Sequence, residues 1–150
     1  MNADMRALGI DLGSKRIGVA TSDRSGTIAT PLTVLQRGAS RLIDHQSIAA
    51  LVVEYEAECV VIGLPLNMSG SVGLAARAAL NEADEMASVV NVPVYTYDER
   101  LTTVTADHIL MEQKMKAQAR RRVVDKVAAA VMLQSWLEHR RNQLADTAGE

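Results

Sequence analysis

The chain has 150 residues, of which 48% are hydrophobic and 23% are charged, and its formal net charge at pH 7 is −2. This length fits one domain with one core, and the composition is typical of a globular protein. Three Tyr, one Trp and no Phe exclude a site that stacks many nucleic-acid bases on aromatic rings, and the negative net charge confines any nucleic-acid contact to a local basic patch.

The single cysteine, Cys59, excludes an internal disulfide and a cysteine-rich zinc site. It lies inside the apolar run CVVIGL, where we expect a small buried side chain. The first residues, MNADMRALGI, lack the apolar run of a signal peptide, and no stretch approaches the ~20 apolar residues of a membrane span. We therefore expect a cytoplasmic protein without a membrane partner.

The first part of the chain alternates apolar runs with short turns. Strands are predicted at about 7–11 and 16–22, joined by Gly-Ser-Lys, and at 27–35, after the turn Asp-Arg-Ser-Gly. Such short connections join antiparallel neighbours. A helix is predicted over 40–56, where apolar residues recur at helical spacing.

The rest of the chain alternates strands with helices. The run CVVIGL (59–64) predicts a strand buried on both faces. The elements expected after it are a helix over 74–90, a strand over 92–97, a helix from Thr102 or Thr103 to about Lys116, and a last helix from about Val123 to Arg141. In that last helix the run VAAAVML is apolar on every side, which predicts burial on both flanks.

Strands separated by helices pair in parallel through right-handed crossovers. The predicted fold class is therefore α/β, with a mixed five-stranded sheet of three antiparallel strands followed by parallel strands, flanked by helices. Residues 1–150 are expected to form a single domain, with a core over about 7–141 and a flexible tail over 142–150.

The first candidate site residue is Asp11, in GIDLGSKRIGVATSD, where an apolar strand ends. An aspartate that accepts backbone hydrogen bonds in the turn with Gly13 would explain this acid alone. It would not explain the basic pair Lys15 and Arg16, whereas a metal site that handles phosphate needs both the acid and the bases. In that interpretation Asp11 holds the metal, Gly13 lets the substrate approach, and Lys15 and Arg16 bind the phosphate backbone.

A second pair of acids, Asp98 and Glu99, follows the strand VYTY. Open sheets of this type place their sites at such strand ends. Alternation sends the two side chains to opposite faces, so only one of them is expected to point into the site. The alternative is a solvated strand end in which Asp98 pairs with Arg100.

The third acid, Asp125, is the only acid between Lys114 and Leu137, and it opens an apolar helix. The helix dipole favours an acid in a first turn by ~0.3–1 kcal/mol, which is the alternative explanation. That effect does not explain the surrounding cations, which resemble phosphate contacts around a metal ligand. These cations, which a solvated basic turn would also explain, are Lys114, Lys116, Arg120, Arg121, Arg122 and Lys126.

Three carboxylates select hard cations such as Mg²⁺ or Mn²⁺. Because crowded carboxylates raise one another's pKa, the cluster favours a bound cation. Two such ions activate a water and stabilise the leaving oxygen of a phosphodiester. The three histidines, His45, His108 and His139, have no metal-ligand spacing and are expected on helix surfaces. The sequence contains neither a P-loop nor a dinucleotide-binding GxGxxG motif.

Four segments together resemble the sequence blocks of the YqgF family, also called RuvX, over about residues 7–140. They are GIDLGSKRIGVATSD, VVIGLPLNMSGS, YDERLTT and VVDKVAAAVMLQSWL. The resemblance implies an RNase H-like fold and a divalent-metal nuclease.

By position, the resemblance makes Asp11, Glu99 and Asp125 the catalytic and metal-binding acids, with Asp98 as a further candidate. The family's loop often reads NMDGS, whereas Ser69 replaces that acid here. Asn67 and Ser69 remain candidates for hydrogen bonds to phosphate or sugar. Arg100 is counted among the candidate nucleic-acid contacts.

The resemblance favours a pre-16S rRNA nuclease that processes the 5′ end of the 16S rRNA precursor in ribosome biogenesis, with the small-subunit precursor as partner. The first alternative is a Holliday junction resolvase that acts on branched DNA in recombination and repair. The resolvase is expected to be a homodimer, whereas the nuclease is expected as a monomer or a homodimer. A lower alternative is a non-catalytic RNA-binding factor for ribosome assembly.

A different class is the ATPases related to actin and sugar kinases, whose first phosphate loop also reads like DxGxxxxGVA. Those proteins need two such domains, and 150 residues cannot hold both.

Overall fold

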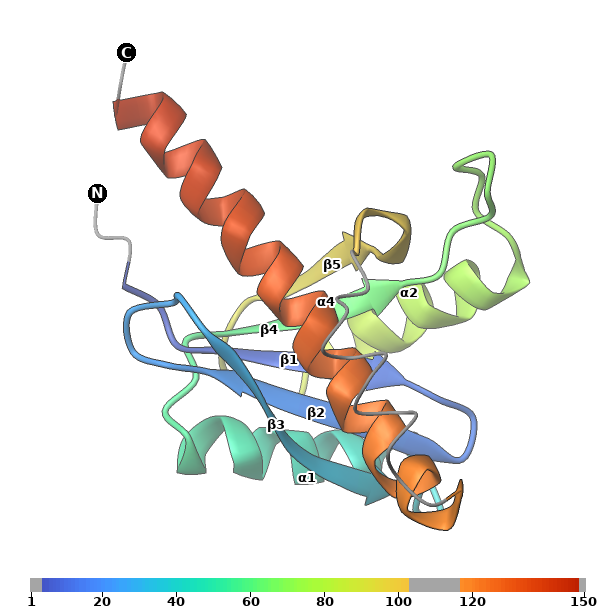
Figure 1. Ribbon diagram of the computed structural model, residues 1–150. Helices are drawn as coiled ribbons and strands as arrows, with labels where there is room; N and C mark the ends of the chain where they lie inside the picture. Colours follow the sequence, from blue (N-terminus) through green and yellow to red (C-terminus); the bar gives the residue numbers. More distant parts are fainter. Residues whose placement is uncertain (1–3, 103–116, 149–150) are drawn as a thin grey trace.

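The computed structural model describes residues 4–102 and 117–148, and it forms one sheet with helices on both faces (Figure 1). The sheet has five strands in the order β3-β2-β1-β4-β5. β1 pairs antiparallel with β2, and β2 with β3, whereas β1–β4 and β4–β5 are parallel. The predicted mixed sheet is confirmed. The strands are β1 (Ala7–Leu12), β2 (Arg16–Ser22), β3 (Ala29–Gln36), β4 (Cys59–Leu64) and β5 (Val94–Asp98).

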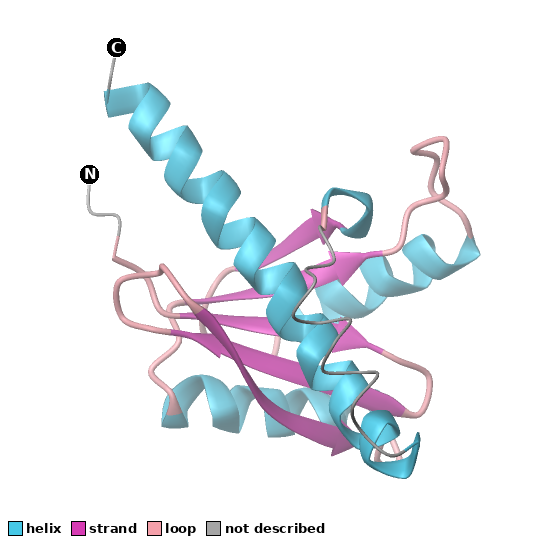
Figure 2. Ribbon diagram, in the orientation of Figure 1, coloured by secondary structure: helices cyan, strands magenta, loops and turns pink. Residues whose placement is uncertain are grey.

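The helices divide between the two faces of the sheet, with α4 (Ala117–Ala148) on one and α1 (Arg41–Glu54) and α2 (Leu74–Ala87) on the other (Figure 2). Two apolar clusters fill these layers. One joins strand residues such as Ile10 and Ile62 to α1 and α2. The other joins alternate strand residues such as Val61 to α4. The central strands are therefore buried on both faces, as their continuous apolar runs predict.

Helix α4 is longer than the sequence suggested. It begins at Ala117 rather than Val123 and ends at Ala148 rather than Arg141, so residues 142–148 are helical instead of forming a flexible tail. The physical reason is the absence of any Gly or Pro between Pro93 and Gly149, which leaves nothing to interrupt the helix. Arg120, Arg121 and Arg122 therefore belong to α4.

The short helix η1 (Glu99–Leu101) follows β5, and Thr102 is its C-cap. The helix predicted from Thr102 or Thr103 to Lys116 otherwise lies outside the described residues. The other predicted helices and strands appear within about three residues of their expected bounds. In the part of the chain that the structure describes, no helix is both long and apolar enough to cross a lipid bilayer.

Helix α4 approaches the sheet very closely, and two glycines allow it. A Cβ on Gly9 would lie 2.8 Å from the Cβ of Leu133, and one on Gly18 would collide with the backbone carbonyl of Asp125. Most of the run VAAAVML is buried, but Ala128 and Val131 are only half-buried. Burial on both flanks is thus confirmed for most of this run, and these two residues line a cavity instead.

Candidate active site

Asp11 lies near the end of β1 on the face that α4 covers. Side chains alternate along a strand, and Gly9, two residues earlier, contacts α4. Asp11 pairs in register with Gly18 of β2, and Gly18 lies directly beneath the backbone of Asp125. The close approach of α4 therefore brings Asp125 next to Asp11, although 114 positions separate them in the sequence.

Glu99 reaches the same place from the other side of β1. It is the first residue of η1, immediately after β5. A Cβ on Gly63 of β4 would lie 2.7 Å from the Glu99 Oε1 atom, so the glycine leaves room for this carboxylate. Gly63 is not among the site residues that the sequence predicts. The signal was a glycine near the end of an otherwise apolar strand.

The three acids influence one another electrostatically. The pKa of Asp11 is raised to about 6, chiefly by burial and then by the negative charges of Glu99 and Asp125. The pKa of Glu99 is also raised, first by burial and then by Asp98. Both carboxylates are therefore held in a setting that disfavours their negative charge and favours a neighbouring cation.

Asp125 already has a cationic partner. The Arg16 Nε atom donates a hydrogen bond of 2.7 Å to Asp125 Oδ2, which joins the start of β2 to α4. Among the described residues, no group of three His, Cys, Asp or Glu side chains has a geometry that could hold a metal ion. Lys15, the neighbour of Arg16, is exposed and forms no ion pair with any described residue.

Asp98 faces away from this group. Its carboxylate accepts hydrogen bonds from the backbone N–H of Arg100 at 2.9 Å and from the Arg100 guanidinium at 2.7 Å, and these contacts lower its pKa. Arg100 also donates to the backbone carbonyl of Met68, which ties η1 to the loop between β4 and α2. The structure contains the Asp98–Arg100 pair of that alternative.

Two cavities meet at the acids. The larger, of about 680 Å³, extends from Asp11 and Glu99 to the start of α1 and the side of α2. The smaller, of about 280 Å³, lies between the sheet and α4, where Ala128 and Val131 line it. Asp11, Gly63 and Glu99 line both cavities, so these acids are accessible from two sides.

The sequence profile of the RuvX family, described as Holliday junction resolvase, matches residues 5–139. The chain belongs to the RuvX family. Its relatives include three proteins named "Putative pre-16S rRNA nuclease". The one from Mycobacterium sp. (strain KMS) is 45% identical over 93% of this chain and 83% of its own length. The others are from Thermoanaerobacter pseudethanolicus, 39% identical over 93% and 100%, and Anaeromyxobacter sp. (strain Fw109-5), 48% identical over 91% and 98%.

The fold of this RuvX-family chain is also that of a solved resolvase. Thermus thermophilus RuvC in complex with a Holliday junction substrate superposes with a TM-score of 0.58, over 92% of this chain and 96% of RuvC. The same protein in a second structure gives a TM-score of 0.56. At 18% and 16% identity these matches show a shared architecture, and the predicted RNase H-like fold is confirmed.

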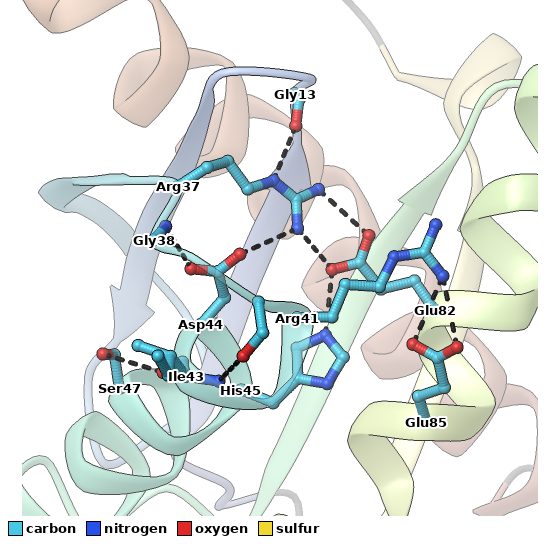
Figure 3. A network of polar contacts seen from close by, with 11 residues as sticks. Gly13, Arg37, Gly38, Arg41, Ile43, Asp44, His45, Ser47, Glu82 and Glu85 are labelled. Carbon is cyan, nitrogen blue, oxygen red and sulfur yellow. Dashed lines mark hydrogen bonds and ion pairs between the residues drawn. The ribbon is translucent and has the colours of Figure 1, made fainter.

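A buried ionic network, which the sequence did not reveal, lines the other end of the larger cavity (Figure 3). The Arg37 guanidinium donates to both carboxylate oxygens of Glu82, at 2.6 and 3.0 Å, and to Asp44 at 3.3 Å. Its Nε atom donates to the backbone carbonyl of Gly13 at 3.0 Å. Arg37 therefore joins the β1–β2 turn to α1 and α2. No local sequence pattern could have revealed it, because the carboxylate partners come from two different helices.

His45 belongs to the same network, and its expected position on a helix surface was wrong. Its side chain is 1% exposed, and its Nε2 atom lies 2.9 Å from Glu82 Oε2. The histidine can be buried because α2 supplies a carboxylate partner 37 positions away in the sequence. His139 is exposed, as expected, and its ring packs edge-on against Tyr97. His108 lies outside the described residues.

The remaining predicted contacts for nucleic acid are only partly described. In the loop after β4, Asn67 donates to Ser71 Oγ at 2.9 Å and Ser69 lies 3.0 Å from the same atom, so both help to hold the loop. Lys126 is half-buried on α4. The side chains of Arg120, Arg121 and Arg122 lie outside the described part of the structure, as do Lys114 and Lys116.

Proposed function

We propose that this RuvX-family chain is a divalent-metal-dependent nuclease that hydrolyses phosphodiester bonds in processing the 5′ end of the 16S rRNA precursor. The observation that carries the proposal is the grouping of the buried Asp11 with Glu99 and Asp125. Burial, together with the charges of the other two acids, raises the pKa of Asp11 to about 6. The names of relatives that are 39–48% identical support the choice of substrate.

The donor set suits Mg²⁺ or Mn²⁺, because all three proposed ligands are carboxylates. As the structure has them, the described acids do not share a metal-binding geometry, so their side chains would have to turn toward a common ion. A cation bound there would offset the burial and the repulsion that raise the pKa of Asp11. When bound, the metal would supply an activated water and stabilise the charge on the leaving oxygen. Lys15, exposed in the turn after β1, and Lys126, which follows Asp125 in α4, would bind phosphates of the strand. Arg120, Arg121 and Arg122, with Asn67 and Ser69, remain predicted contacts.

The decisive experiment uses the purified chain, a 5′-labelled RNA that spans the junction between precursor and mature 16S sequences, and Mg²⁺ or Mn²⁺. We expect cleavage that requires the metal and is lost on addition of EDTA. Asp11→Asn and Glu99→Gln should abolish it, whereas Asp98→Asn, which removes a carboxylate facing Arg100, should retain it. Equal cleavage by Asp11→Asn and the parent protein would refute the site assignment.

A second candidate function is cleavage of a Holliday junction, which the description of the family profile favours. The carboxylate cluster is compatible with an RNA or a DNA substrate, because it would act on the phosphate, which both contain. The same preparation tested on a four-way DNA junction separates the two functions. Specific junction cleavage by a dimer would favour the resolvase. RNA binding without any cleavage, unchanged in Asp11→Asn, would favour a non-catalytic assembly factor.

A further inference from the structure

The ion pair between Arg16 and Asp125 is unusual because one partner is a proposed metal ligand. Their side chains are 38% and 25% exposed, and the pair lies at the edge of the acid cluster. It rests on the tight contact between Gly18 and the backbone of Asp125, which fixes α4 over β2. The pair is thus defined by backbone packing and not only by two flexible side chains.

A guanidinium and a divalent cation on the same carboxylate would repel each other strongly at such short range. Arg16 binds Asp125 through Oδ2, and the two cations therefore compete for this carboxylate, so that the binding of one weakens the binding of the other.

We infer that Arg16 alternates between two partners: the carboxylate of Asp125 in the metal-free protein and a phosphate of the substrate in the metal-loaded protein. The inference rests on the proposed function, because it takes Asp125 as a metal ligand. A guanidinium suits both partners, since its planar fork fits carboxylates and phosphates equally well. Arg16 is a positioning residue that holds Asp125 in place until the metal binds.

The other arginines around the larger cavity are held by groups outside the proposed ligand set. Arg37 is fixed by Glu82, Asp44 and the carbonyl of Gly13. Arg41 pairs with Glu85 at 3.2 Å on the exposed side of α1. Arg16 is the described arginine whose release would free a ligand in the acid cluster.

Exchange of partners makes metal binding and phosphate binding cooperative. A phosphate that binds Arg16 frees Asp125 and so raises the affinity for the metal, and by linkage the metal raises the affinity for the phosphate to the same extent. The metal-free protein would then bind divalent cations weakly until the nucleic acid arrives.

The test measures Mn²⁺ affinity by calorimetry without nucleic acid at pH 8, for the parent protein, Arg16→Gln and the matched control Lys15→Gln. Both variants lose one positive charge from the same turn, but Lys15 has no described ionic partner. We expect Arg16→Gln to bind Mn²⁺ on the order of tenfold more tightly than the parent, and Lys15→Gln less than about twofold more tightly.

A second measurement follows the affinity for the precursor RNA by fluorescence anisotropy, without metal and with Ca²⁺ under conditions in which no cleavage is detected. Arg16→Gln should bind RNA like the parent without metal and several-fold more weakly with Ca²⁺. Lys15→Gln should bind RNA more weakly than the parent by the same factor in both conditions, because the contact of Lys15 with phosphate does not depend on release from Asp125.

The possible outcomes separate the inference from the proposed function. If Arg16→Gln binds Mn²⁺ no more tightly than the parent or Lys15→Gln does, the partner exchange is refuted while the nuclease proposal stands. If none of the three proteins binds Mn²⁺, the metal-dependent function itself fails. Should Arg16→Gln unfold, Arg16→Met, which keeps the length of the side chain without its charge, replaces it in the same measurement and should also bind Mn²⁺ more tightly than the parent.

Discussion

The larger cavity has carboxylates at both of its ends, and the two ends differ in what surrounds them. At one end, burial would raise the pKa of Glu82, but hydrogen bonds from Arg37 and His45 outweigh it and the pKa is lowered. At the other end, burial and neighbouring acids raise the pKa of Asp11 to about 6, and no cation among the described residues reverses the effect.

This contrast separates a structural cluster from a functional one. The Arg37 network is complete in itself, because its guanidinium spans Asp44, Glu82 and a backbone carbonyl. At the acid site, the negative charge of the carboxylates is only partly compensated by the protein, and a bound cation would stabilise it. Strongly perturbed acids in a cavity are typical of functional sites, whereas fully paired buried acids hold elements together.

The largest expected effect is on catalysis at the Asp11 end of the cavity. Asp11→Asn should lower the rate of RNA cleavage by roughly a thousandfold, because it removes a charge that the reaction requires while leaving the fold intact. Single-turnover kinetics at saturating protein would measure it. Glu82→Gln, in the Arg37 network at the other end, should retain cleavage at temperatures well below its unfolding midpoint. A similar loss in both variants would erase the distinction between the two ends.

The next largest effect is on the stability of the protein when the Arg37 network is broken. Glu82→Gln leaves Arg37 buried with fewer charged partners and removes the carboxylate that His45 contacts. Breaking a buried ion pair from one side typically costs about 3–5 kcal/mol in the free energy of unfolding. Urea denaturation of Glu82→Gln and of the control Glu85→Gln, whose pair with Arg41 is half-exposed, would measure the difference. We expect less than about 1 kcal/mol for the control.

Ionisation of Asp11 should lower the stability of the fold, whereas ionisation of Glu82 supports it. The pKa of Asp11 is higher in the folded chain, about 6, than its ordinary value of 3.8, so its ionisation destabilises the fold as pH rises from 4 to 6. Asp11→Asn should therefore be more stable than the parent at pH 7–8, by up to about 3 kcal/mol, and the advantage should vanish near pH 4. Urea unfolding of both proteins across this range tests the sign. Saturating Mn²⁺ at pH 8 should reduce the difference, because it stabilises the parent more.

Which of these features the sequence could predict follows from the range of the interactions. Apolar runs and short turns determine the sheet locally, and strand ends mark Asp11 and Glu99, so the fold and the candidate acids could be proposed in advance. The pairs Arg16–Asp125 and His45–Glu82 join residues 109 and 37 positions apart. Periodicity indicates which face a residue occupies, but it does not identify its partner on another element.

The choice between Asp98 and Glu99 gives the smallest predicted effect. The two acids are adjacent in the sequence, yet Glu99 lines both cavities and Asp98 accepts hydrogen bonds from Arg100. Asp98→Asn should lower RNA cleavage by only a few fold, and Arg100→Gln should do the same, because each removes one half of an exposed pair. Glu99→Gln should match the loss in Asp11→Asn. If Asp98→Asn instead loses as much activity as Glu99→Gln, both acids act in the site. The hydrogen bonds from Arg100 would then not limit Asp98 to a structural role.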